Sequence, residues 1–196
     1  MLHVPYHTLH VPYNLRPATI SDAHHIARLV DFAGDGLYYH HWRSIAFPGT
    51  DPWTVGYQQV QSQTGDMSYT DTTLANISGR VLAGMVTYPI VEPHVDDENL
   101  PALFKPIVEL ENLAVDTYYI SVLAAYPEFR GLGIGGRLLE LAERKSANQP
   151  LSLIVNDGNS GAYRLYERRG FRKHTSRPII KDDWDGAGDN WVLMMR

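Results

Sequence analysis

The amino-acid sequence predicts a mixed α/β fold, because strand-like and helix-like segments occur along most of its 196 residues. Residues 118–125 are rich in β-branched and aromatic side chains, as strands are, and a glycine-rich turn and a leucine-bearing helical segment follow them. The runs 72–78 and 81–88 flank a Ser78-Gly79 turn and predict a β-hairpin. A chain of this length can form one substantial core, so a single domain is expected.

The N-terminus is expected to be an extended arm, residues 1–13, that precedes a domain at 14–196. The arm repeats His-Val-Pro-Tyr, and each proline disfavours helix at the residue before it. Its histidines at positions 3, 7 and 10 have no carboxylate among them and no helical spacing, so a metal site there is the weaker reading. We expect the arm to pack on the domain or to make a contact in a homodimer.

The residue pattern in the first third of the domain predicts a short strand followed by two helices. Ser21 can cap the first helix, whose apolar side chains recur at helical spacing through residue 30. The aromatic-rich stretch 34–53 is expected to be mostly loop. Residues 54–63 are expected to form the second helix.

A long connection, residues 92–116, separates the predicted hairpin from the strand at 118–125. It contains three prolines and an acidic run from Glu92 to Glu98, and a short helix is expected near 108–113. Connections of this length are often functional, so we expect a substrate lid whose negative charge suits a cationic acceptor. At the other end of the domain, a glycine-rich loop precedes an apolar strand at 191–195 that would close the sheet.

The segment Arg130-Gly-Leu-Gly-Ile-Gly-Gly136 is the strongest indication of a binding site. Glycines let the backbone approach a ligand closely, and the first N–H groups of a helix have no partner within it. A strand, a glycine-rich turn and a helix N-terminus together form an anion site, to which Arg130 adds positive charge. We expect a pyrophosphate to bind there.

Two other interpretations of this turn remain. Gly131, Gly133 and Gly136 satisfy the dinucleotide pattern G-x-G-x-x-G, and Asp157 follows about 20 residues later. In that pattern the glycines come directly after the strand, whereas here residues 126–130 intervene. A glycine-rich turn without a ligand is the other interpretation, although so many glycines reduce the tendency to form a helix.

The spacing of Arg130, Gly133 and Gly135 resembles the acetyl-CoA-binding pattern Arg/Gln-x-x-Gly-x-Gly/Ala of the GNAT superfamily of N-acyltransferases. A second segment, Asn159 to Phe171, is similar to the late motif N-x-x-A-x-x-L-Y-x-x-x-G-F of that family. Its Ala162, Leu165, Tyr166 and Arg169 share one helix face, and Gly170 suits the helix end. With Arg16-Pro-Ala-Thr-Ile-Ser-Asp-Ala23, which resembles the family's opening, the likeness extends from Asn14 to the end.

The resemblance implies a mixed, mostly antiparallel sheet with helices on both faces, and an acetyl-CoA-dependent N-acetyltransferase. It also implies that Tyr166 is the general acid that protonates the departing thiolate; the residues alone allow a core tyrosine instead. The residues implied in binding acetyl-CoA are Leu123, Ala124, Ala125, Arg130, Gly131, Leu132, Gly133, Ile134, Gly135, Gly136, Asn159 and Tyr166.

The chemistry also requires a proton acceptor, since an amine with a pKa near 10.4 is protonated at neutral pH. Tyr119 and Ser121 share one face of the cofactor strand and are the residues expected nearest the reaction, but neither is an obvious base. Three acids lie close by in sequence, and any of them could end a chain of waters to the amine: Glu109, Glu111 and Asp116. The sequence leaves the choice open.

Composition limits the function classes. The chain has no cysteine, which excludes thiolate metal sites and a cysteine nucleophile and favours direct attack in a ternary complex. No metal is expected. Residues 130–181 carry 11 basic against 4 acidic residues, a net +7 that suits phosphates, while the other residues carry 6 against 18, a net −12. An acidic total argues against nucleic acid as a partner.

No leader and no membrane span are expected from the apolar pattern, so the cytoplasm is the predicted location. The predicted function is transfer of an acetyl group from acetyl-CoA to the primary amine of a small molecule. The alternatives are a peptide or protein amine as acceptor and, in another class, an acyl-CoA-binding sensor without catalysis.

Overall fold

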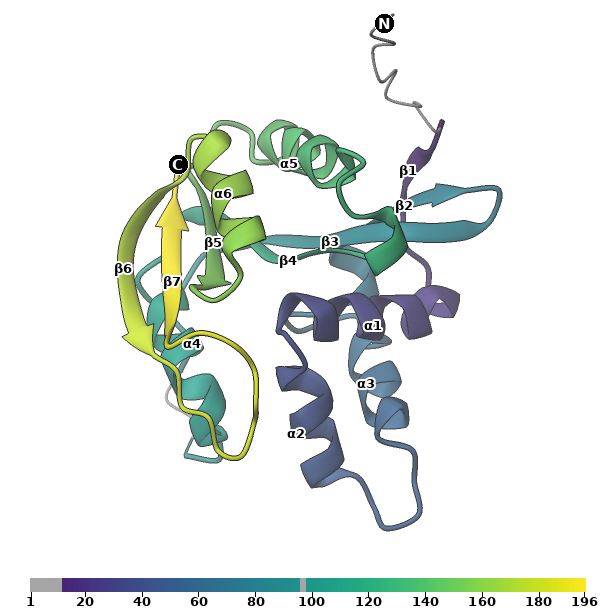
Figure 1. The fold of residues 1–196 in the computed structure, drawn as a ribbon, viewed down its shortest axis with the longest axis vertical. Coiled ribbons are helices and arrows are strands. Elements are labelled where there is room, and N and C mark those ends of the chain that lie inside the picture. The colour runs from purple at the N-terminus through teal and green to yellow at the C-terminus, as the bar shows by residue number, and fades with distance from the viewer. Residues whose placement is uncertain (1–11, 96–97) are drawn as a thin grey trace, which may run out of the picture.

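The computed structural model describes residues 12–95 and 98–196, and within them one seven-stranded sheet runs through the molecule (Figure 1). Its strand order is β1-β2-β3-β4-β5-β7-β6, and every neighbouring pair is antiparallel except β4 and β5. The strands are β1 (Asn14–Pro17), β2 (Thr72–Ile77), β3 (Arg80–Ile90), β4 (Thr117–Ala125), β5 (Leu151–Asn156), β6 (Arg172–Pro178) and β7 (Asn190–Met195).

Helices cover both faces of this sheet, as predicted. The structure places α5 and α6 on one face, where Leu138, Leu139 and Tyr166 are buried in one apolar cluster with the strands. On the other face α1, α2, α3 and α4 bury side chains such as Ile26, Trp42 and Leu110. The helices are α1 (Ala23–Ala33), α2 (Leu37–Ile45), α3 (Pro52–Val60), α4 (Lys105–Glu111), α5 (Ile134–Lys145) and α6 (Ser160–Arg168).

The beginning of α1 differs from the expected Ser21 cap. A 3₁₀ turn, Ile20–Asp22, precedes the helix, and the Asp22 carboxylate accepts hydrogen bonds from Thr19 N at 2.8 Å and from Arg16 at 2.8 Å. Ser21 bonds only to the Thr19 hydroxyl. The prediction of a Ser21 cap is wrong, because Ser21 lies inside this turn, and Thr19 and Asp22 form the capping box at its start.

The expectation of a mostly loop segment at 34–53 is also wrong, because α2 lies there. Gly36 begins this helix in the left-handed region, with φ +86°, which only glycine adopts readily. Leu37 and Trp42 then become fully buried, and Trp42 Nε1 donates to Gln59 of α3 at 2.7 Å. The second predicted helix is confirmed as α3, which Asp51 caps by accepting from Trp53 N at 3.1 Å.

The predicted hairpin is confirmed as β2 and β3. Ser78 and Gly79 both have positive φ, at 47° and 85°, as a two-residue type I′ turn requires. In the connection 92–116 the helix begins at Lys105, earlier than expected, and its Leu110 is buried against the sheet. The lid function of this connection stays a prediction.

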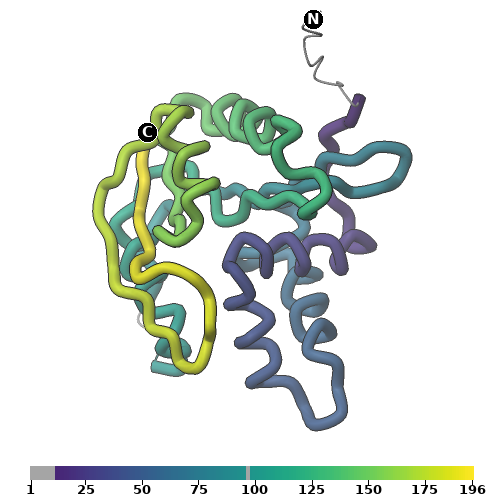
Figure 2. Tube along the Cα trace, viewed as in Figure 1, coloured from purple at the N-terminus to yellow at the C-terminus, as the bar shows by residue number. Residues whose placement is uncertain are grey.

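The structure describes the C-terminal strand of the chain but not most of the predicted N-terminal arm. The predicted arm lies mainly at 1–11, outside the described residues, whereas the C-terminal strand β7 lies between β5 and β6 (Figure 2). Tyr13, at the start of the described chain, packs on the core beside α5, with the Arg137 guanidinium 5.6 Å from its ring centre. No helix within 12–95 and 98–196 is long and apolar enough to span a bilayer.

Candidate active site

Strand β4 separates from β5 halfway along its length. The two strands pair only from Tyr118 to Ile120 of β4. At Ser121 the pairing of β4 with β3 shifts by one residue, which is a β-bulge. A bulge bends its strand and increases its twist, so residues 121–125 diverge from the end of β5. The edge of β4 that faces β5 is therefore open over these residues.

A cavity of about 760 Å³ occupies this opening, and we call it the large cavity. Its volume lies in the range of small-molecule and cofactor sites. The glycine-rich turn, α6 and the last residues of α1 complete its walls. Of the residues predicted for the site it brings together Ser121, Leu123, Ala124, Ala125, Arg130, Gly131, Gly133, Ile134, Gly135, Gly136, Asn159 and Tyr166.

The glycine-rich turn presents a helix N-terminus to the large cavity. Gly131 and Gly133 have φ of +75° and +78°, values that side-chain-bearing residues rarely adopt. Gly133 precedes the first turn of α5, whose Ile134, Gly135 and Gly136 line the cavity. The N–H groups of that first turn have no acceptor within the helix and carry the positive end of its dipole. The turn can therefore hold an anion.

Positive charge lies beside this helix end. Arg130 donates through Nε to the Ala125 carbonyl oxygen at 3.2 Å, which ties the turn to the end of β4. Arg168, which the sequence did not indicate, reaches the same cavity from α6. Neither guanidinium forms an ion pair with a described residue, so both are available to a negative ligand.

Tyr166 lies on the wall of the large cavity opposite β4, with 6% of its surface exposed. Its ring packs edge-on against Phe171 with the ring centres 5.9 Å apart. Its hydroxyl makes no hydrogen bond with any described residue, and burial raises its pKa well above the ordinary value for tyrosine. The phenol is therefore protonated at neutral pH and has its proton free to donate.

Local sequence fixes the helix that carries Tyr166. The Asn159 side chain caps α6 by accepting from Ala162 N at 3.1 Å. Gly170, with φ +90°, ends the helix, and Phe171 is then fully buried. Gly170 thus ends the helix as the sequence predicted, whereas the cap by Asn159 was not predicted.

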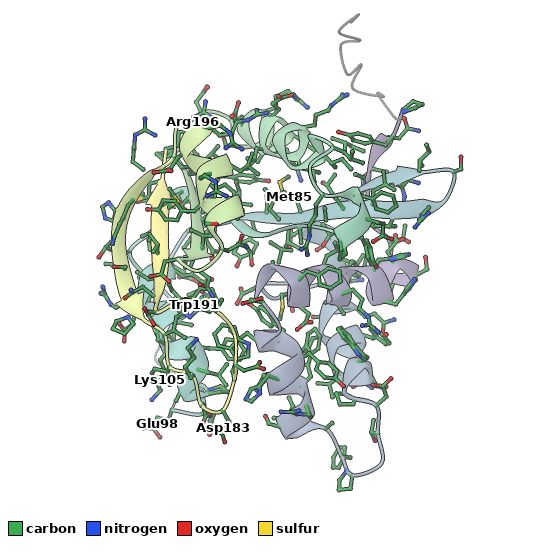
Figure 3. The ribbon with its side chains drawn as sticks, in the orientation of Figure 1. Met85, Glu98, Lys105, Asp183, Trp191 and Arg196 are labelled. Carbon is green, nitrogen blue, oxygen red and sulfur yellow. The ribbon has the colours of Figure 1, made fainter. Side chains whose placement is uncertain are left out.

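A second cavity, of about 40 Å³, adjoins the large one, and we call it the small cavity. Ala33, Ser121 and Ile154 line both. Tyr119, which was expected near the reaction, lines only the small cavity, and Leu132 lines neither. The remaining wall residues of the small cavity are Gly34, Leu37, Tyr38, Ile107, Glu111 and Trp191, the last of which is labelled in Figure 3.

Glu111 supplies a buried carboxylate to the small cavity. Its side chain is 7% exposed, and Oε2 lies 3.1 Å from Nε2 of His94, whose side chain is 31% exposed. Burial raises the pKa of Glu111, while the hydrogen bond from His94 and the nearby Tyr119 hydroxyl lower it. The same hydrogen bond raises the pKa of His94.

The structure separates the three acids that the sequence left open. Glu109 is exposed and forms an ion pair with Arg177 at 2.7 Å. Asp116 occupies a left-handed turn with φ +66° and lines neither cavity. Of these three acids, only Glu111 lines either of the two cavities. Its partner His94 was not predicted, because the two meet only after β3 and α4 have packed.

Metal ligation has no support among the described residues. Within 12–95 and 98–196 no three His, Asp or Glu side chains gather closely enough to hold an ion. The histidines of the arm at 3, 7 and 10 lie outside the described residues.

An open strand edge that leads to a helix N-terminus and a protonated tyrosine defines a site for an extended anionic ligand. Residues 37–171, more than half of the chain, match the model of the Acetyltransferase (GNAT) family. The chain therefore belongs to the GNAT acetyltransferases, as the motifs predicted.

Solved structures show the same fold. An N-acetyltransferase from Staphylococcus aureus Mu50 is 19% identical, with a TM-score of 0.65 over 93% of this chain and 100% of that one. PH1933 from Pyrococcus horikoshii OT3 is 15% identical, with a TM-score of 0.62 over 94% and 98%. A structure described as histone acetyltransferase HPA2 and related acetyltransferase, from Corynebacterium glutamicum, is 18% identical, with a TM-score of 0.60 over 93% and 94%. No curated protein matches the chain.

Proposed function

We propose that this protein transfers an acetyl group from acetyl-CoA to the primary amine of a small molecule. The observation that carries the proposal is the large cavity, in which the open edge of β4, the N-terminus of α5 and Tyr166 face one space. Acetyl-CoA is long, flexible and negatively charged at one end. It needs a strand edge for its amide-containing arm and an anion site for its pyrophosphate.

The residues present fit such a ligand. The backbone of Leu123 to Ala125 has no partner strand on the β5 side, so it can pair with the amides of the arm. The first turn of α5 can bind the pyrophosphate through its free N–H groups, with Arg130 and Arg168 adding charge. The excess of basic residues in 130–181 also supports binding of the phosphates beside the first turn of α5.

In this proposal the chain acts by positioning and by proton transfer. The amine nitrogen attacks the acetyl carbonyl carbon directly, a C–N bond forms and the C–S bond breaks, since no cysteine is present to carry the acetyl group. A backbone N–H of residues 123–125 donates to the carbonyl oxygen as it gains charge. Tyr166 donates its proton to the departing thiolate.

A small acceptor is favoured over a protein by the contacts that wall one side of the large cavity and by the size of the small cavity. Asp35 and Ala187 both line the large cavity, and Ala187 N donates to the Asp35 carboxylate at 2.9 Å. Trp184 Nε1 donates to the Asp35 carbonyl oxygen at 3.1 Å, so the loop between β6 and β7 is held against the end of α1. This contact forms one wall of the large cavity, and the adjoining small cavity has room for a slim group only.

The test is release of free thiol from acetyl-CoA with a panel of small amines, peptides and a protein. We expect turnover with at least one small primary amine, and mass spectrometry should find the acceptor heavier by one acetyl group. Turnover with peptides alone would replace the small-molecule acceptor by a peptide amine. Binding of acetyl-CoA without turnover on any acceptor would favour the sensor.

A further inference from the structure

We propose that Glu111 accepts the proton of the acceptor amine and that His94 is the positioning residue that holds its carboxylate. Both belong to the connection 92–116, so this segment would supply the base of the reaction. The inference rests on the proposed function, because it assigns a role in that transfer.

The position of Glu111 supports this role. It is the last residue of α4, which is anchored on the sheet by the fully buried Leu110. The carboxylate lines the small cavity, which meets the large cavity at Ser121 of the β4 bulge. The proposed function places the acetyl carbonyl at residues 123–125 of the same strand, so an amine that enters the small cavity past Ser121 would lie between the carbonyl and Glu111.

The burial of Glu111 also requires an explanation. A buried carboxylate is costly unless it is paired and hydrogen-bonded, and removing one partner leaves an uncompensated charge. Here His94 provides one partner at 3.1 Å, and the Tyr119 hydroxyl provides a second, neutral one. Glu111 also lines the small cavity, where an ammonium group would add a charged partner.

Burial raises the pKa of Glu111, and the charged groups around it modify that rise. Asp66 adds negative charge from the loop before β2. Tyr38 of α2, Tyr88 of β3 and Tyr119 of β4 stay neutral, since burial raises the pKa of each. Trp191 of β7 also lines the small cavity, and its side chain has no titratable group. The hydrogen bonds from His94 and from the Tyr119 hydroxyl oppose this rise in pKa, and that of His94 has the larger effect.

The proton balance is complete with these groups. The protonated amine gives one proton to Glu111 and attacks as the neutral nitrogen. The nitrogen loses a second proton as the amide forms, while the thiolate takes one from Tyr166. One of the two amine protons restores Tyr166 through solvent, and one leaves to bulk water. The imidazole of His94, part-exposed beside Glu111, lies on the route outward.

The first experiment compares Glu111→Gln with Glu109→Gln. The two positions lie on the same helix and lose the same charge, but Glu109 is exposed and lines neither cavity. We expect kcat to fall by about 10²–10⁴-fold in Glu111→Gln and to change little in the control. Affinity for acetyl-CoA, measured by calorimetry, should be unchanged in both. Equal kcat in the two variants would overturn the role of Glu111.

The second experiment measures how rate depends on pH in His94→Ala and His94→Gln. Because the hydrogen bond of His94 lowers the pKa of Glu111, its loss in the alanine variant should move the acidic limb upward by about one pH unit. Glutamine keeps a donor near the Nε2 position and should recover part of the shift. A structural role alone would lower the melting temperature and leave the limb in place.

A readout without acetyl-CoA completes the test. The His94 imidazole, followed by NMR in the full chain, should titrate at higher pH in the native protein than in Glu111→Gln. An unchanged His94 titration would remove the coupling on which the inference depends. If the native protein does not bind acetyl-CoA or acetylate any amine, the proposed function fails; if it does and Glu111→Gln does too, only this inference fails.

Discussion

Replacing Tyr166 with phenylalanine distinguishes between two roles of this residue, a proton donor in the reaction and a tyrosine that only packs in the core. The ring contact with Phe171 is kept, and only the hydroxyl is lost. That hydroxyl has no hydrogen-bond partner among the described residues, so its removal breaks no protein contact that the structure shows. A hydroxyl bonded within the core would instead contribute about 1 kcal/mol, or roughly 2–4 °C in melting temperature for a chain of this size.

The effect on turnover should be much larger. General-acid contributions are about 10²–10⁴-fold, which corresponds to about 3–5 kcal/mol in the activation barrier. We expect kcat of Tyr166→Phe to fall by this factor and KM for acetyl-CoA to stay within about twofold. An acetyl donor with a more acidic thiol needs less protonation of its thiolate. With that donor, kcat of Tyr166→Phe should fall by a smaller factor.

The assay is thiol release, with melting temperature measured on the same preparations. Tyr163→Phe is the matched control, because Tyr163 lies on the same helix and packs on the same core cluster without lining the large cavity. A Tyr166→Phe protein that is stable and fully active would show that Tyr166 is not the proton donor. A protein that is less stable but active would identify a structural tyrosine.

Other substitutions test the fold and the anion site. Gly133→Val and Gly79→Val place a side chain at similar positive φ in open space and should cost similar stability, about 1–3 kcal/mol, but only the first should abolish acetyl-CoA binding in calorimetry. Gly56→Ala brings a Cβ within 2.6 Å of the buried Trp42 ring and should cost roughly 1–3 kcal/mol in urea denaturation. Asp22→Asn should lose roughly 1–3 kcal/mol at pH 7. Because hydrogen bonds depress the pKa of Asp22 in the folded state, the difference from the native protein should shrink as pH falls below about 4, and a pH-independent difference would contradict this.

Elements with strong local signals were predicted well. The β4 strand, the glycine-rich turn and the capped α6 carry their signals in consecutive residues, since turn glycines, a capping asparagine and helical spacing act within a few positions. The I′ turn of the hairpin also carries its signal in two consecutive residues, Ser78 and Gly79. The large cavity is lined by these elements, so it lies where the sequence predicted a binding site.

Features that depend on distant residues could not be predicted in the same way. Helix α2 is built from tyrosines, histidines and a tryptophan, which are poor helix formers, and packing of Trp42 against α3 stabilises it. The proximity of Glu111 and His94 depends on how α4 packs on the sheet. The sequence could name Glu111 among three acids, and only the small cavity distinguishes it.

We propose that the large cavity binds acetyl-CoA, and calorimetric titration of the native protein is the decisive measurement. We expect saturable binding of acetyl-CoA at one site per chain, weaker binding of a dephosphorylated pantetheine analogue that lacks the pyrophosphate, and no binding to Gly133→Val. If acetyl-CoA does not bind, or if NADH binds saturably in its place, the large cavity is not an acetyl-CoA site.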